Sequence, residues 1–133
     1  MTTSYAPFFD GSNVKPYTLD LLGDQGELLL DGKMPERTVI LFYASWCGAC
    51  KSAKPKYKKL ADALARDSNV LVAAMDYDSA RAQFATRITK WKYDIKYYPT
   101  LVSFYKGKPY SIYTGNFEPS DLLAYVKNIG SKW

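Results

Sequence analysis

The sequence contains no histidine and only two cysteines among its 133 residues. Without histidine there is no Ser-His-Asp or Cys-His nucleophile pair and no imidazole proton shuttle. Two cysteines supply too few soft ligands for a zinc or iron–sulfur site within one chain, so we expect no metal and no cofactor. The remaining reactive groups are two thiols, carboxylates, tyrosines and lysines.

Long apolar runs are also missing. The longest fully apolar stretches, such as residues 39–44 and 70–75, stop at six residues, whereas a membrane-spanning helix needs about 20. The first seven residues lack the basic and apolar regions of a signal peptide. We therefore expect a cytoplasmic protein that makes no membrane contact.

The chain is nevertheless rich enough in apolar and aromatic residues to fold. Its composition is 47% apolar, with 3 Trp, 12 Tyr and 6 Phe, which excludes intrinsic disorder. The length fits one domain over residues 1–133, with an irregular lead-in at 1–35 that holds a first strand. We expect this domain to be a monomer.

The charge is uneven along the sequence. The segment 51–108 carries thirteen basic and five acidic side chains. Such a run either steers acidic partners or forms the solvated face of a helix, and the second interpretation is favoured. No nucleic-acid-binding motif accompanies it, so we expect no nucleic-acid partner.

Apolar periodicity predicts strands and helices in alternation. The expected elements are a strand within 14–22, a buried strand at 38–44, a helix at 48–66, a buried strand at 69–75, a helix at 79–91, a hairpin of 100–105 and 110–114 around a turn at 106–109, and a helix at 120–129. From residue 38 the order is β-α-β-α-β-β-α. Helices between buried strands require parallel neighbours and the hairpin adds an antiparallel edge, which predicts an α/β fold with a mixed sheet flanked by helices.

The two cysteines lie together in the run Trp46-Cys47-Gly48-Ala49-Cys50, where a buried strand ends and a helix begins. Side chains three apart in a first helical turn face the same way. A cysteine at a helix N-terminus commonly has its pKa lowered to roughly 3.5–7.5, so we expect Cys47 to be a nucleophile. We expect Gly48 to permit the tight turn, and Lys51 and Lys54 to add positive potential.

Two other interpretations of the pair carry less weight. A structural disulfide across so short a loop removes little chain entropy. Half of a zinc site would need a second chain to complete it. A redox-active dithiol is the favoured interpretation.

The segment 42–51 resembles the active-site segment of the thioredoxin superfamily, that is, of thioredoxins and protein disulfide isomerase domains. Pro55 resembles the family's helix proline, and Tyr98-Pro99-Thr100 resembles the segment whose proline is cis beside the dithiol. The likeness covers residues 38–129 and implies a thioredoxin-like fold. From the local sequence alone, Pro55 either kinks or ends its helix, and Pro99 is equally compatible with a trans bond.

The sequence departs from the family at three functional positions. Leu41 stands where relatives carry a buried acid that manages the proton of the second cysteine, and no lysine occurs in 70–80 to pair with such an acid. Asn116 replaces the arginine of disulfide isomerase domains. Ala49 replaces the proline of thioredoxins and the histidine of the isomerases.

The resemblance implies a thiol–disulfide oxidoreductase that reduces, forms or rearranges protein disulfides. Cys47 and Cys50 are the expected catalytic residues. Substrate contacts are expected at Trp46, Gly48, Ala49, Tyr98 and Pro99. The implied partners are disulfide-containing proteins and an unidentified electron donor or acceptor. The alternative is a thioredoxin-like binding or scaffold module with little turnover.

Overall fold

The computed structural model describes residues 7–9, 11–30, 32–91, 93 and 95–130. The expectation about a signal peptide depends on the first six residues, which lie outside this set. Within it, five strands form one sheet in the order β1-β3-β2-β4-β5. The strands are β1 (Lys15–Pro16), β2 (Arg37–Tyr43), β3 (Val70–Asp76), β4 (Thr100–Tyr105) and β5 (Lys108–Ile112).

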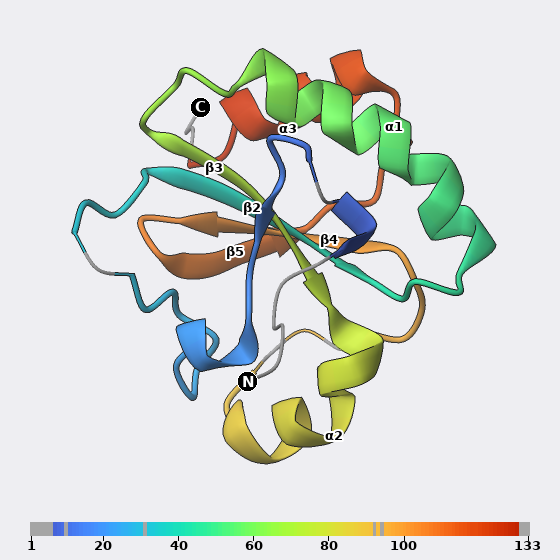
Figure 1. Ribbon diagram of the computed structural model, residues 1–133. Coiled ribbons are helices and arrows are strands. Elements are labelled where there is room, and N and C mark those ends of the chain that lie inside the picture. Colours follow the sequence, from blue (N-terminus) through green and yellow to red (C-terminus); the bar gives the residue numbers. More distant parts are fainter. Residues whose placement is uncertain (1–6, 10, 31, 92, 94, 131–133) are drawn as a thin grey trace.

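Three α-helices cover the two faces of this sheet: α1 (Gly48–Ala63), α2 (Tyr77–Arg87) and α3 (Pro119–Lys127). Figure 1 shows α1 and α3 together on one side of the sheet and α2 on the other. Alternate residues of β2 feed two buried clusters, Val39 and Leu41 on the first and Ile40 and Phe42 on the second. The α/β mixed sheet predicted from the sequence is confirmed. Among the described residues, no helix has the length and apolarity needed to cross a bilayer.

The direction of β4 corrects one part of the prediction. β3 is parallel to β2, as expected, but β4 is antiparallel to β2. The last residue of β2, Tyr43, pairs with Asp76, and its neighbour Phe42 pairs with Thr100. The chain therefore leaves β3 and enters β4 at the same end of the sheet.

Element boundaries differ from prediction at several places, of which three affect the path of the chain most. The strand expected within 14–22 has only two paired residues, since the chain turns into a 3-10 helix, η2 (Leu19–Leu21). The helix α2 ends at Arg87 rather than residue 91. The hairpin turn is shorter than expected, because Lys106 and Gly107 have positive φ (51° and 86°) and reverse the chain in two residues.

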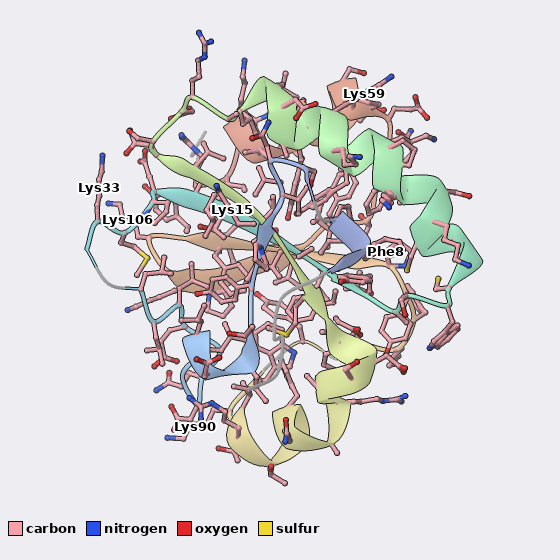
Figure 2. All side chains as sticks on the ribbon, in the orientation of Figure 1. Phe8, Lys15, Lys33, Lys59, Lys90 and Lys106 are labelled. Atoms are coloured by element: carbon pink, nitrogen blue, oxygen red, sulfur yellow. The ribbon has the colours of Figure 1, made fainter. Side chains whose placement is uncertain are left out.

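The N-terminal lead-in is packed against α1 and β2. A 3-10 helix, η1 (Pro7–Phe9), brings Phe8 into a stacked contact with Tyr43 at 4.8 Å between ring centroids. Phe9 is 2% exposed and touches the rings of Tyr43 and Tyr57 at 5.6 and 5.8 Å. Figure 2 labels Phe8 on η1. Phe8 and Phe9 are therefore part of the packed structure.

We expect Phe9→Ala to lower the free energy of unfolding by about 3–5 kcal/mol, because it leaves a cavity between the tyrosine rings. Urea denaturation measures this change. Leu29→Ala is the control, since Leu29 is 43% exposed and should change stability by less than about 0.5 kcal/mol. Equal effects of the two substitutions would show that η1 contributes nothing to the core.

Candidate active site

Cys47 lies at the junction between β2 and α1, as the N-cap residue of the helix. Its extended backbone (φ −77°, ψ 123°) lets the side chain turn back over the first turn. There Sγ accepts a hydrogen bond from the backbone N–H of Cys50 at 3.2 Å. The sulfur thus occupies the place of the oxygen in an ordinary N-cap and faces the positive end of the helix dipole.

The two thiols are free and differ in their surroundings. Cys47 is 8% exposed, whereas Cys50 is fully buried in the cluster that contains Leu41. Burial, followed by the hydrogen bond to Cys47, raises the pKa of Cys50 to about 12. Cys50 therefore keeps its proton at neutral pH, and Cys47 is the more exposed of the two cysteines.

The peptide bond between Tyr98 and Pro99 is cis, as the resemblance implies. The thiol of Cys47 donates to the carbonyl oxygen of Tyr98 at a sulfur–oxygen distance of 3.7 Å. Thr100 holds the preceding turn, since its hydroxyl donates to the Tyr97 carbonyl at 2.7 Å. The segment that leads into β4 thereby presents the Tyr98 backbone directly beside Cys47.

Trp46 is the most prominent side chain next to the dithiol. It is 64% exposed and meets the ring of Tyr98 edge-on at 5.9 Å. Its indole N–H donates to Asp78 at 2.9 Å. Asp78 belongs to the first turn of α2, 32 residues away, and it was not predicted from the sequence because no local pattern links it to Trp46.

Gly48 and Ala49 are both exposed in the first turn of α1. The prediction that Gly48 permits a tight turn is wrong. Gly48 has ordinary helical geometry without a positive φ, and a Cβ there would meet nothing within 4 Å. The space above Gly48 is open, which leaves room for another chain to approach Cys47.

Two of the three positions that depart from the family have structural explanations. Leu41 is fully buried and pairs with Ala74 of β3 and Leu101 of β4, so an apolar side chain completes the sheet beneath the dithiol. Asn116 accepts a hydrogen bond from the backbone of Glu118 at 3.0 Å, just before α3. Its side chain shapes the start of that helix.

Two further expectations about α1 have clear outcomes. The helix continues through Pro55 instead of ending there. Lys51 is exposed, as a source of positive potential requires, whereas Lys54 lies over the ring of Phe8 at 4.9 Å. Lys56 forms an ion pair with Glu118 at 2.7 Å.

Among the described residues, no cluster of three or more His, Cys, Asp or Glu side chains is placed to hold a metal ion.

A mixed five-stranded sheet with a cysteine pair at the β2–α1 junction, beside a cis-proline, defines a thioredoxin-fold dithiol protein. The thioredoxin family model matches residues 30–128. The chain belongs to the thioredoxin family.

Its curated relatives include protein disulfide-isomerases. Chicken protein disulfide-isomerase A3 is 36% identical over 91 residues, which are 67% of this chain and 17% of the relative. Protein disulfide-isomerase 1 of Dictyostelium discoideum is 36% identical over 106 residues, which are 79% of this chain and 28% of the relative. The chain thus spans less than a third of the length of these proteins.

Solved structures agree on the fold. The first thioredoxin domain of mouse protein disulfide-isomerase A4 superposes with a TM-score of 0.58 at 30% identity, covering 74% of this chain and 66% of that one. Human ERp44 in form II has a TM-score of 0.65 at 20% identity, covering 96% of this chain and 32% of that one. The second likeness shows the fold alone.

The raised pKa of Cys50 predicts how fast it can displace a group attached to Cys47. In the mixed disulfide between Cys47 and thionitrobenzoate, attack by Cys50 needs its thiolate. Burial, the largest cause of the raised pKa of Cys50, applies in the mixed disulfide too, so the thiolate fraction grows about tenfold per pH unit between pH 7 and pH 9. We expect the release of thionitrobenzoate, followed by absorbance, to accelerate accordingly. A rate that stays flat over this range would contradict a buried, protonated Cys50.

Leu41→Glu places a base in the apolar layer that contains Cys50. We expect it to accelerate the same release at pH 7 by roughly 10²-fold, the low end of general base catalysis. Leu41→Gln is the matched control, because it has the same length but no basic group. Similar rates for the two variants, both verified as folded by circular dichroism, would count against a missing proton acceptor as the cause of slow release.

Proposed function

We propose that the chain is a thiol–disulfide oxidoreductase that acts on protein disulfides through Cys47 and Cys50. The observation that carries this proposal is the position of the Cys47 sulfur. It accepts the Cys50 N–H at the start of α1 and lies beside the Tyr98 carbonyl. A helix N-terminus stabilises the thiolate over the thiol, and the thiolate is the nucleophile in disulfide exchange.

The reaction has two balanced steps. The Cys47 thiolate attacks one sulfur of the substrate disulfide, which forms a Cys47–substrate disulfide and releases the other substrate sulfur as a thiolate. Cys50 then loses its proton to water or solvent base, and its thiolate attacks the Cys47 sulfur, which breaks the mixed disulfide and releases the second substrate sulfur as a thiolate. This forms the Cys47–Cys50 disulfide, so the protein is oxidised by two electrons and the substrate is reduced. An external dithiol returns the protein to its starting state.

Substrate contacts follow from the exposed surroundings of Cys47. An extended substrate segment pairs with the Tyr98 backbone before Pro99, in the manner of an added strand. It passes over Gly48 and Ala49, where a Cβ on Gly48 would meet nothing within 4 Å. Trp46 offers its exposed ring to the residue next to the reacting cysteine.

The relatives support the substrate class, because several are protein disulfide-isomerases by name. Disulfide-containing proteins are therefore the proposed partners of this chain, which acts as a monomer with an electron donor or acceptor of unidentified nature. We continue to predict that the chain reduces protein disulfides in a cytosol-like compartment. The reduction potential of the dithiol can be measured against glutathione. A value of about −270 mV, as in thioredoxin, would support a reductase. A value of about −180 mV, as in protein disulfide isomerase, would support an oxidase or isomerase.

A second candidate function is a binding module that holds its partner as a lasting mixed disulfide. The deep burial and raised pKa of Cys50 favour it, since both slow the release step. The two candidates differ in turnover, not in the first step.

Reduction of insulin driven by dithiothreitol decides between them. We expect the wild-type protein to accelerate the precipitation of insulin chains and Cys47→Ser to return the rate to that of dithiothreitol alone, because the nucleophile is gone. Cys50→Ser should form the mixed disulfide without releasing it, which mass spectrometry detects. Equal activity of wild type and Cys47→Ser would overturn the proposal that the chain is an enzyme. A wild type that forms the mixed disulfide without turnover would favour the binding module.

A further inference from the structure

Helix α1 differs from the other two helices in its charge. It contains five lysines and a single acid, Asp62. By contrast, α2 contains two arginines and one aspartate, and α3 contains one lysine and one aspartate. The excess of positive charge is therefore particular to the helix that begins at the dithiol.

The order of the charges along α1 is unfavourable for a helix. α2 and α3 each have an acid in the first turn and a base in the last turn, as the helix dipole favours, whereas α1 has neither. Lys54 and Lys58 are like charges four residues apart, which destabilises a helix. The stability of α1 therefore does not explain its lysines.

The protein itself neutralises only part of this charge. Lys56 pairs with Glu118, and Lys54 lies over an aromatic ring. Three other lysines of α1 form no ion pair in the part of the chain that the structure describes: Lys51, Lys58 and Lys59. Their charges face solvent without a partner from this chain.

These lysines border a hollow on the outer side of α1. Its volume is about 280 Å³, and it is lined by Lys54, Pro55, Lys58, Lys59 and Asp62. Together with Lys51, the three lysines of the hollow form what we call the α1 lysine face. A carboxylate that enters the hollow is surrounded by three lysines and one acid.

The dithiol accounts for Lys51 but not for the lysines farther along the helix. A helix rises 1.5 Å per residue, so Lys58 and Lys59 lie about 17 and 18 Å from Cys47 along the axis. Exposed charges are largely screened beyond about 8 Å at physiological ionic strength. These two lysines therefore contribute little to the ionisation of Cys47.

The composition of the face distinguishes among anionic partners. Single-stranded nucleic acid is bound through aromatic stacking as well as phosphate contacts, and a membrane surface through apolar side chains that insert. The large apolar side chains that are exposed in the described structure, Leu29, Trp46, Tyr97 and Tyr110, all lie outside α1. The face therefore fits a short run of carboxylates on a protein.

We infer that the α1 lysine face docks an acidic segment, a run of Asp or Glu side chains, on the protein that exchanges a disulfide with Cys47. This inference rests on the proposed function and deepens it, because it names the chemistry of the partner. The sequence alone favoured a solvated helix face for these lysines. The absence of internal partners for them and their distance from Cys47 favour docking instead.

The test uses peptides with one internal disulfide and a six-residue extension on either side. The face lies roughly 6 to 18 Å from Cys47 along the helix axis, and six extended residues span about 20 Å. One set carries six glutamates, and the matched set carries six glutamines. At about 20 mM salt we expect KM for the better glutamate peptide to be about tenfold lower than for its glutamine partner, with equal kcat, because several exposed ion pairs act together. The difference should disappear at about 0.5 M salt.

Charge-reversal variants assign the effect to α1. The double variant Lys58→Glu, Lys59→Glu should remove the preference for glutamate. Lys33→Glu with Lys108→Glu is the control, because it changes the net charge equally and both lysines are exposed outside α1. Figure 2 labels Lys33 and Lys59 on different sides of the view.

All variants should reduce bis(2-hydroxyethyl) disulfide, which is small and uncharged, at the rate of the wild type. Equal KM values for the glutamate and glutamine peptides at low salt, or equal effects of the two double variants, would overturn the inference.

A binding measurement separates this inference from the proposed function. Fluorescence anisotropy of labelled glutamate and glutamine peptides without cysteine reports on the face without any exchange reaction. Preferred binding of the glutamate peptide, lost in the Lys58→Glu, Lys59→Glu variant, supports docking even if no disulfide is reduced. Normal reduction of the uncharged disulfide together with no preference for glutamate would leave the dithiol intact and refute the docking surface. Tighter binding of oligothymidylate of equal charge, or of phosphatidylserine vesicles, would overturn it in favour of nucleic acid or membrane.

Discussion

The contact between the Cys47 sulfur and the backbone N–H of Cys50 is the interaction on which the rest of the site depends. At 3.2 Å it caps α1 with a sulfur atom and sets the sulfur in the positive field of the helix end. This contact requires the chain to pass from β2 into α1 within a few residues. A hydrogen bond from the Cys47 N–H to the Ala44 carbonyl at 3.1 Å closes that turn. The same turn exposes Trp46 and Ala49 on either side of the sulfur.

This arrangement divides the two cysteines between two environments. Cys47 is 8% exposed and its sulfur contacts the Cys50 N–H and the Tyr98 carbonyl, whereas Cys50 is fully buried in the cluster that contains Leu41, Tyr57 and other apolar side chains. The hydroxyl of Tyr57 donates to the Ala73 carbonyl at 2.7 Å, so it is committed to the backbone of the sheet. The dry layer supports the fold but opposes the ionisation of Cys50, and the two steps of the proposed reaction therefore face unequal barriers.

Local patterns predicted the parts of the molecule that depend on near neighbours in the sequence. The β2–α1 junction with Cys47 follows from an apolar run that ends at a Cys-Gly-Ala-Cys turn, and the cis bond before Pro99 follows from the family resemblance. Contacts between distant segments left no such signal. Three features arise only when α2 and the lead-in pack against the sheet. They are the Trp46–Asp78 hydrogen bond, the packing of Phe9 between two tyrosines and the antiparallel direction of β4. Gly48 was misjudged because a glycine at a strand-to-helix junction suggested a conformational need that its helical backbone does not have.

The central claim is that the sulfur of Cys47 is the accessible nucleophile and that of Cys50 is a buried, protonated thiol. Alkylation of the reduced protein by limiting iodoacetamide at pH 7, with each cysteine quantified by peptide mass spectrometry, tests it most directly. The structure predicts that Cys47 is labelled long before any label reaches Cys50. Equal labelling of the two cysteines, or faster labelling of Cys50, would contradict the account.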